Sequence, residues 1–311
     1  MFRGLMQKIK EIEGLSVTCV VDNYYDALRG DPPCGKRFRT KPSLSLYAEH
    51  GLSLYVVVNS GVHSHSLLFD FGVDGEVLLH NLHLLGIDPK TLDALVLSHG
   101  HFDHYGGLLG MLEKLGPMLI PFYVGRGTFT RRFSDIRGEG LTDLGRLERE
   151  RLERKGVKIE EIGSECEILK GVYLTGQIAM KTTYEKIPES LFVEKEGNLE
   201  RDDFLEERAM FFSVKGKGLI ILSGCAHRGI VNTVKQIVEL AGIQKVHAIL
   251  GGFHLISGNE ESILMAVEEI NTFFPSYIIP MHCTGFEACL AFSQIMGENF
   301  ILNTVGTTYS F

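Results

Sequence analysis

The sequence predicts an α/β fold built from packed βα units. Two patterns indicate this class: apolar runs with strand character alternate with stretches whose apolar residues recur at helical spacing, and turn-forming residues separate them. The 311-residue chain exceeds the usual size of one domain, yet α/β folds reach this length with insertions. We therefore expect one domain over residues 1–311, with a large buried core.

The first half of the chain is expected to hold a β-meander followed by alternating helices and strands. Gly86 ends the first expected helix, and Gly116 with Pro117 ends the second, because glycine and proline interrupt helical backbone. The expected strands cover residues 17–22, 52–59, 66–71, 92–97 and 118–124, and the expected helices cover residues 77–85 and 108–115.

The pattern is less regular from about residue 125 to about residue 210, where we expect an inserted α+β subdomain that caps a pocket. Strong helix formers predict a helix within residues 146–158. Two short strands are expected at 157–162 and 171–174, followed by a polar segment from 183 to 205. A glycine-containing loop at the start of this region carries four arginines, namely Arg126, Arg131, Arg132 and Arg137.

Regular alternation returns in the second half, where three strands end in chemically unusual residues. The expected strands are 209–214, 219–222, 246–250 and 277–279, with helices at 229–241 and 260–274. Functional groups gather at the carboxyl ends of strands in open α/β sheets, so we expect these three ends to face one site. Their sequences are Ser-Gly-Cys-Ala-His at 223–227, Gly-Gly-Phe-His at 251–254 and Pro-Met-His-Cys-Thr-Gly at 280–285.

The strongest functional signal is the H-x-H-x-D-H cluster in residues 98–107, directly after an expected strand. Side chains alternate along extended backbone, so His99 and His101 should point to one side. Asp103 and His104 should come from the following turn and reach a second ion. Imidazole suits zinc, iron and manganese, and a carboxylate adds a harder ligand. We interpret the cluster as half of a two-metal site; a solvated polar loop is the alternative.

Composition disfavours several classes of partner. A formal net charge of −8 gives no general attraction to nucleic acid phosphates. No run approaches the roughly 18–20 apolar residues that cross a bilayer, and the amino terminus lacks the long apolar core of a secretion signal. The six cysteines are scattered without a C-x-x-C pair, which fits a reducing cytoplasm. We expect a cytoplasmic protein with no membrane or nucleic acid partner.

Taken together, these motifs resemble the metallo-β-lactamase fold superfamily over essentially the whole chain. The resemblance implies a four-layered αβ/βα sandwich, with two mixed sheets back to back and a metal site at their shared edge. It also implies that Asp70, at the end of the strand over 66–71, is the buried aspartate that supports the metal-binding loop. His282 matches the last metal ligand of the family.

The middle of the chain departs from the family pattern. In the family, a third histidine usually comes from a Gly-His-Thr-like turn, but Leu-Thr-Gly-Gln at 174–177 occupies that place here. A bridging aspartate usually comes from a strand ending in Gly-Asp, but Leu-Ser-Gly-Cys at 222–225 occupies that place. We expect His227 to supply the missing imidazole, with Cys225 as a weaker candidate ligand. The resemblance then implies two divalent ions, zinc with iron or manganese as alternatives. The first would be held by His99, His101 and His227, and the second by Asp103, His104 and His282.

Further residues are candidates for contact with a substrate. Asp22 and Asn23 would lie near the pocket by the resemblance, with an Asx turn as the alternative. His50 is a candidate contact that could equally be a surface turn residue. Arg131 and Arg132 could grip a phosphate, since guanidinium matches phosphate geometry, or could lie on a solvated loop.

Two residues are expected to act in catalysis. His254 follows two glycines at a strand end, where backbone can approach a ligand closely, and is assigned to substrate or transition-state contact. Asp103 is the catalytic candidate among the expected ligands. His63 and His65 share one face of a strand but lie on a hairpin away from the ligand-bearing ends, so a structural role is favoured for them.

Three functions follow from this interpretation. The first is a metal-dependent hydrolase that acts on a phosphate or carboxylic ester through a metal-activated water. The second comes from a narrower resemblance, carried by Glu-His-Gly-Leu-Ser at 49–53 and the three strand-end sequences, to dihydropterin synthases that join a dihydropterin methyl diphosphate to an aminobenzene ribofuranosyl phosphate. The third is a metal-binding sensor without turnover. A small phosphorylated or ester substrate is the expected partner, and a homodimer is left open.

Overall fold

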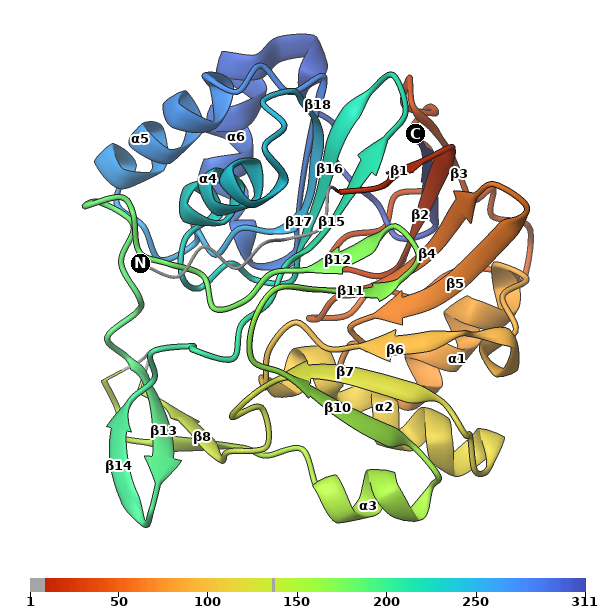
Figure 1. The fold of residues 1–311 in the computed structure, drawn as a ribbon, viewed down its shortest axis with the longest axis vertical. Helices are drawn as coiled ribbons and strands as arrows, with labels where there is room; N and C mark the ends of the chain where they lie inside the picture. Colours follow the sequence, from red (N-terminus) through yellow and green to blue (C-terminus); the bar gives the residue numbers. More distant parts are fainter. Residues whose placement is uncertain (1–8, 136–137) are drawn as a thin grey trace.

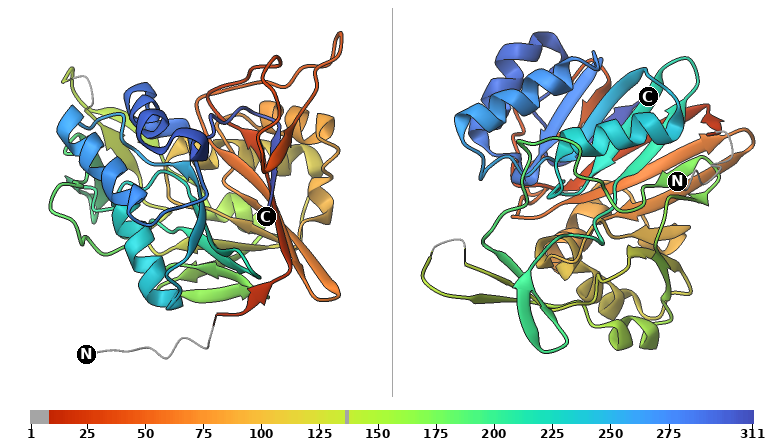
Figure 2. Two further views of the ribbon diagram at one scale, coloured as in Figure 1. Left: turned by 90° about the horizontal axis from the view of Figure 1, so that it is seen from above. Right: turned by 60° about the vertical axis from the view of Figure 1, so that its left-hand side comes forward.

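The computed structural model describes residues 9–135 and 138–311, so the expected loop residue Arg137 lies outside the described residues. Two mixed β-sheets pack face to face, and helices cover the outer face of each (Figures 1 and 2). This arrangement confirms the four-layered αβ/βα sandwich. Helices α4, α5 and α6 lie on one side and α1 and α2 on the other, as the view from above shows (Figure 2).

The sheet formed by the second half of the chain has the order β11-β12-β15-β16-β17-β18, with β1 paired to β15. Strands β16, β17 and β18 run parallel as neighbours, so their carboxyl ends lie at one edge. The strands are β1 (Glu11–Ile12), β11 (Cys166–Leu169), β12 (Val172–Leu174), β15 (Met210–Val214), β16 (Gly218–Ser223), β17 (Val246–Gly252) and β18 (Tyr277–Met281). The helices of this half are α4 (Ile230–Ala241), α5 (Glu260–Asn271) and α6 (Phe286–Met296), with short 3-10 helices at His282–Thr284 and Gly297–Asn299.

The other sheet has the order β10-β7-β6-β5-β4-β2-β19-β3, and β5, β6 and β7 are parallel neighbours. Its strands are β2 (Gly14–Val21), β3 (Gly35–Arg37), β4 (Ser53–Ser60), β5 (His63–Phe69), β6 (Ala94–Val96), β7 (Pro121–Gly125), β10 (Lys158–Ile162) and β19 (Thr307–Ser310). The helices of this half are α1 (Gly75–Leu84), α2 (Phe102–Leu115) and α3 (Arg149–Arg154), with a 3-10 helix at Pro89–Thr91.

The region from 125 to 210 is not one continuous insertion. Strands β8 (Arg132–Ser134), β9 (Thr142–Gly145), β13 (Leu191–Lys195) and β14 (Asn198–Arg201) form a separate four-stranded sheet that projects beside the sandwich (Figure 1). Between them, β10 pairs with β7, and β11 and β12 join the other core sheet. The helix expected within residues 146–158 is limited to α3, because Gly156 takes a left-handed conformation and turns the chain into β10.

Helix α2 begins at Phe102, inside the histidine cluster, and not at Leu108 as expected. The expectation failed because Gly106 and Gly107 interrupt the helical pattern. A Cβ atom would lie 2.4 Å from the Val73 carbonyl oxygen at Gly106 and 2.1 Å from the Phe71 carbonyl oxygen at Gly107. These glycines therefore allow the helix to pack directly on the backbone that follows β5.

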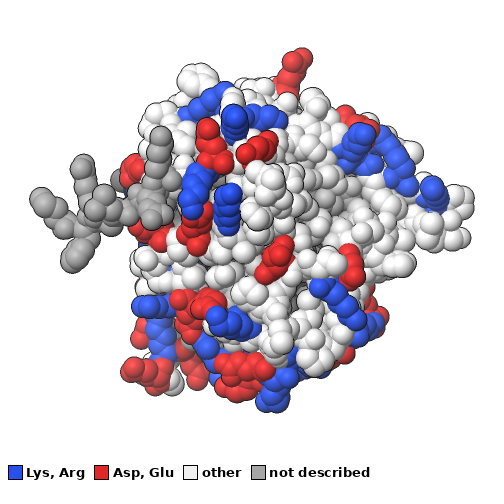
Figure 3. All heavy atoms as spheres, turned by 45° about the vertical axis from the view of Figure 1, so that its right-hand side comes forward, with Lys and Arg blue, Asp and Glu red and all other residues white. Residues whose placement is uncertain are grey.

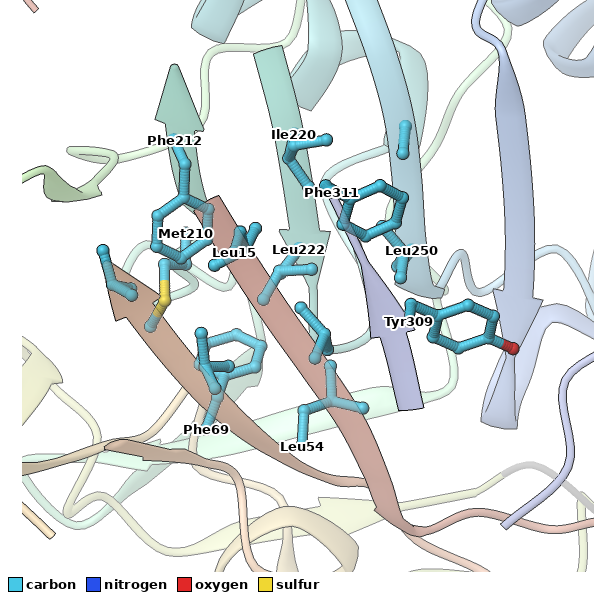
Figure 4. Close-up of a cluster of buried hydrophobic side chains, with 14 of the residues drawn as sticks. Leu15, Leu54, Phe69, Met210, Phe212, Ile220, Leu222, Leu250, Tyr309 and Phe311 are labelled. Carbon is cyan, nitrogen blue, oxygen red and sulfur yellow. The ribbon is translucent and has the colours of Figure 1, made fainter. Parts of the chain in front are cut away.

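The centre of the sandwich is a continuous apolar layer between the two sheets. Leu54 and Phe69 from one sheet face Met210, Phe212 and Leu222 from the other (Figure 4), and all five are fully buried. Side chains alternate along each strand, so the opposite faces pack against the outer helices and form two further apolar clusters. Three apolar layers hold the two sheet edges in a fixed relation to each other.

Charged side chains of both signs are interspersed on the face shown in Figure 3, with no broad field of one sign. Within residues 9–135 and 138–311, the structure contains no helix that is both long and apolar enough to cross a bilayer.

Truncation of the central layer should strongly destabilise the fold. Leu54→Ala removes a fully buried side chain, so we expect the free energy of unfolding to fall by about 2–5 kcal/mol. Leu119→Ala is the matched control, since Leu119 is 97% exposed and its loss should change stability by less than about 0.5 kcal/mol. Chemical denaturation of both variants measures this difference, and equal effects would contradict the described packing.

Candidate metal centre

Side chains from both sheets meet where the carboxyl ends of β6, β16 and β18 face one another. His99 Nε2 lies 3.2 Å from His227 Nε2, although the two residues are 128 positions apart. His104 Nε2 likewise lies 3.2 Å from His282 Nε2. Each pair joins a residue after β6 to one after a strand of the opposite sheet. The structure thus brings the two halves of the expected site together.

The first group of potential ligands is His99, His101 and His227, whose ligand atoms all lie within 4.8 Å of one another. Burial lowers the pKa of all three, that of His101 to about 3. Neutral imidazole keeps a lone pair available for a metal ion. The Phe204 ring stacks on His227 with centroids 3.9 Å apart, which fixes that imidazole in place.

The second group contains Asp103, His104, His282 and Cys225. Asp103 Oδ2 lies 3.1 Å from His282 Nε2, and His104 Nε2 lies 3.1 Å from Cys225 Sγ. Burial alone would raise the pKa of Asp103. The charge of His104 and hydrogen bonds from His282 and His50 outweigh burial and hold this pKa well below its usual range. Asp103 is therefore a carboxylate, as a cation ligand must be. Cys225 reaches this group, which supports its candidacy beside His227.

The donor set fits metal binding. A tetrahedral zinc ion with Zn–N bonds near 2.0–2.1 Å places its ligand nitrogens about 3.3–3.4 Å apart. The two Nε2 pairs, at 3.2 Å each, nearly match this separation. His99 and His227 are neutral because burial lowers their pKa values, and their lone pairs, which face each other at this distance, repel unless a cation or proton lies between them. The residues present therefore fit a divalent cation.

Asp70 fixes the loop that carries these histidines. Its carboxylate accepts hydrogen bonds from the backbone N–H of Ser98 at 2.7 Å, from Ser98 Oγ at 2.7 Å and from His104 Nδ1 at 2.6 Å. Both Asp70 and His104 are completely buried. A bond to Nδ1 leaves Nε2 of His104 free to face the cluster. This geometry matches the supporting position expected for Asp70.

Backbone strain is concentrated around the cluster. Four residues have φ angles in the left-handed region, which residues other than glycine rarely adopt. They are Asp70 (61°), Ala226 (56°), His254 (45°) and His282 (48°). Each follows the end of a strand, namely β5, β16, β17 and β18. Such a conformation costs about 1–3 kcal/mol per residue, so it persists where the surrounding structure imposes it. It turns the chain sharply, which is how all four loops direct side chains toward one place.

Asp22 and Asn23, expected to contact substrate, both hydrogen-bond to His282. Asp22 Oδ1 accepts hydrogen bonds from the backbone N–H groups of His282 and Asn23, and Oδ2 accepts one from Asn303 Nδ2. Asn23 Oδ1 lies 3.1 Å from His282 Nδ1. The sequence placed both residues near the site but could not show that β2 ends beside β18. Their hydrogen bonds hold the backbone and the imidazole of His282 in place.

Arg132 also differs from expectation. Its guanidinium is buried, pairs with Asp202 and Glu206, and donates to the carbonyl oxygens of Gly100, Thr128 and Thr130. Each of its three nitrogen atoms thus has a partner within the protein, and the side chain is buried away from a phosphate in the solvent. Because Gly100 lies between His99 and His101, Arg132 braces the loop that carries them. Arg131 points to the surface and pairs with Asp143.

His50 and His254 lie at the cluster, in agreement with their expected positions. His50 Nε2 is 3.3 Å from Asp103 Oδ2, and its side chain is 65% exposed. The His254 ring lies 4.0 Å from the His227 ring and borders a cavity of about 490 Å³. Tyr184, Lys186 and Phe253 line the same cavity. This hollow adjoins the first group of ligands and has room for a substrate.

Two residues of the site carried no role in the sequence analysis. Glu207 accepts hydrogen bonds from the backbone N–H groups of His227 and Arg228, and burial raises its pKa to about 7. Cys283 places its Sγ 3.1 Å from Cys225 Sγ. The neighbouring His282 was a signal for Cys283, but nothing local indicates that Glu207 lies beneath His227. His63 and His65 lie in β5, outside the cluster.

The fold and the donor cluster define a class of enzyme that binds divalent metals at the edge of an αβ/βα sandwich. The chain belongs to the metallo-β-lactamase superfamily. The model of that superfamily matches residues 50–169. The 7,8-dihydropterin-6-methyl-4-(β-D-ribofuranosyl)-aminobenzene-5'-phosphate synthase of Methanocaldococcus jannaschii is 34% identical over 258 residues, which cover 82% of this chain and 87% of the relative.

Two further similarities support this placement. An uncharacterized protein of the same organism is 30% identical over 265 residues, which cover 84% of this chain and 93% of that protein. Among solved structures, a metal-dependent hydrolase of the β-lactamase superfamily superposes with a TM-score of 0.75 at 25% sequence identity, covering 94% of this chain and 98% of that one. The similarity to the synthase agrees with the narrower resemblance seen in the sequence.

Replacement of the supporting carboxylate should weaken metal binding while leaving the ligands in place. Asp70→Asn removes the charge that holds His104 Nδ1–H, so we expect the affinity for Zn²⁺ to fall by about 10- to 100-fold. Asp93→Asn, at the opposite end of β6, is the control. Competition with a chromophoric chelator measures both affinities, and equal values for the two variants would contradict the role of Asp70.

The adjacent arginines should differ sharply in their effect on stability. Arg132→Ala leaves Asp202 and Glu206 buried without their partner, so we expect a loss of about 3–5 kcal/mol in the free energy of unfolding. Arg131→Ala breaks an exposed pair and should cost less than about 1 kcal/mol. Urea denaturation of both variants tests this contrast. A stable Arg132→Ala protein that has lost affinity for phosphate would restore the original substrate-binding interpretation.

Proposed function

We propose that the protein is a metal-dependent synthase that joins a dihydropterin methyl unit, carried as its diphosphate, to an aminobenzene ribofuranosyl phosphate. The observation that carries this proposal is the 34% identity to a synthase of that product over 82% of the chain. The site supports it, because Cys225 stands where a carboxylate would be expected to bridge two ions around an attacking water. A transfer reaction has no need of that water.

The cations, zinc with iron or manganese as alternatives, would neutralise negative charge on the departing diphosphate. In the reaction, the arylamine nitrogen forms a bond to the pterin methylene carbon, the carbon–oxygen bond to diphosphate breaks, and the amine releases a proton. The protein must exclude water from this exchange. Burial of His99, His104 and His227 gives the dry surroundings that favour condensation over hydrolysis.

The cavity beside His227 is the proposed substrate site. Its volume of about 490 Å³ lies in the range of small-molecule pockets. Phe253 offers apolar surface for an aromatic ring, and Lys186 offers a positive charge for a phosphate. His254 would contact the substrate from the wall, and the exposed His50 would do so from the side of Asp103.

A second candidate is the hydrolysis of a phosphate or carboxylic ester. The observation that favours it is the similarity, at a TM-score of 0.75, to a metal-dependent hydrolase of the superfamily. In that reaction Asp103 would act on the attacking water, since its carboxylate remains ionised at the cluster. Metal binding without turnover, as in a sensor, is the third function and leaves the cavity without a chemical role.

Product analysis distinguishes the three functions. We expect Zn²⁺-loaded protein, incubated with dihydropterin methyl diphosphate and the aminobenzene ribofuranosyl phosphate, to form the coupled product detected by mass spectrometry. His101→Ala should lower the rate at least about 100-fold because a buried ligand is lost, whereas the surface variant His63→Ala should match wild type. Release of diphosphate without coupling would support the hydrolase instead. A fully metallated protein that forms neither product would indicate the sensor.

A further inference from the structure

Two buried thiols and an imidazole meet beside the second group of ligands. Cys225 follows β16, His254 follows β17 and Cys283 follows β18, so three neighbouring parallel strands each contribute one side chain. Cys225 Sγ lies 3.1 Å from Cys283 Sγ. One ring nitrogen of His254 lies within 4.8 Å of both sulfur atoms. The proposed reaction gives Cys283 no role.

The chemistry of this cluster is that of a cation site. Thiolate with imidazole is the donor set that binds zinc and other thiophilic ions. Nδ1 of His254 is buried and has no hydrogen-bond partner among the described residues. A buried nitrogen without a hydrogen-bond partner is unfavourable, and a ligand bound to it would remove that cost.

The backbone packs closely against the thiols. A Cβ atom at Gly252 would lie 2.8 Å from Cys283 Sγ and 2.2 Å from the Gly224 carbonyl oxygen, so only glycine lets the strand end approach the sulfur this closely. With Zn–S bonds near 2.3 Å, two thiolates on a tetrahedral ion lie about 3.8 Å apart. The sulfur atoms, now 3.1 Å apart, would need to separate by about 0.7 Å.

We propose that Cys225, His254 and Cys283 form a third cation position, selective for thiophilic ions such as Zn²⁺ and Co²⁺. Cys225 Sγ also lies 3.1 Å from His104 Nε2, so it is shared with the second position and couples the two ions. Three protein ligands would leave a tetrahedral ion one coordination place open. The alternative is a thiol pair held only by hydrogen bonding, in which Cys283 Sγ accepts from the His254 backbone N–H.

Cobalt titration tests this third position without reference to activity. Apo-protein, reduced and kept free of oxygen, is titrated with Co²⁺ while bound metal and thiolate-to-cobalt charge-transfer absorption are measured. We expect three ions per chain. Cys283→Ser should bind two and lose about half of the charge-transfer absorption, because one of two thiolate donors is gone. Cys289→Ser, a half-buried cysteine of α6 outside the cluster, should behave as wild type.

A second measurement needs no variant. The third equivalent of Zn²⁺ should protect Cys225 and Cys283 from alkylation, as peptide mass analysis would show, while the labelling of Cys34 and Cys166 stays unchanged. Saturation of wild type and Cys283→Ser at the same number of ions, with the same absorption, would overturn the third position. So would unchanged labelling of Cys283. Neither readout depends on which reaction the enzyme catalyses, so each distinguishes failure of this site from failure of the proposed function.

Discussion

The carboxylate of Asp70 is the interaction on which the rest of the site depends. It binds the backbone and side chain of Ser98 at the start of the histidine loop and His104 in the first turn of α2. The loop is thereby joined to the end of β5, and Nε2 of His104 is directed toward the opposite sheet. Gly224 must pass closely over this contact, since a Cβ there would lie 2.9 Å from Asp70 Oδ2 and 2.0 Å from Ser98 Oγ. One buried carboxylate thus sets the distance between the two sheet edges.

Other parts of the fold support the same geometry with groups that never face a substrate. Arg132 ties the separate four-stranded sheet to the Gly100 carbonyl oxygen, between two of the potential ligands. Asp22 holds the backbone of His282, and Glu207 holds that of His227. Each of these charged groups is buried and hydrogen-bonded, as burial of charge requires. These supports come from both sheets, and Asp22 holds the backbone of His282, one of the four left-handed residues at strand ends.

Much of the fold and half of the site could be predicted from the sequence. The histidine cluster and Asp70 are local signals, because each follows a strand that is apolar enough to recognise. His227 was inferred from the missing third histidine, and the structure places it beside His99. The roles of Arg132, Asp22 and Glu207 could not be predicted, since they depend on partners between 20 and 260 positions away. Cys283 was overlooked because its partner, Cys225, is distant in the sequence. The two residues approach each other only because β16 and β18 lie on either side of β17.

The central claim is that the facing imidazoles at this sheet edge enclose divalent cations. Anomalous X-ray diffraction from crystals of the Zn²⁺-loaded protein, recorded on both sides of the zinc absorption edge, tests it most directly. The account predicts at least two anomalous peaks, about 3.5–4 Å apart, one between His99 and His227 and the other between His104 and His282. A map with no anomalous peak between these imidazoles, or with zinc only at surface residues, would contradict it.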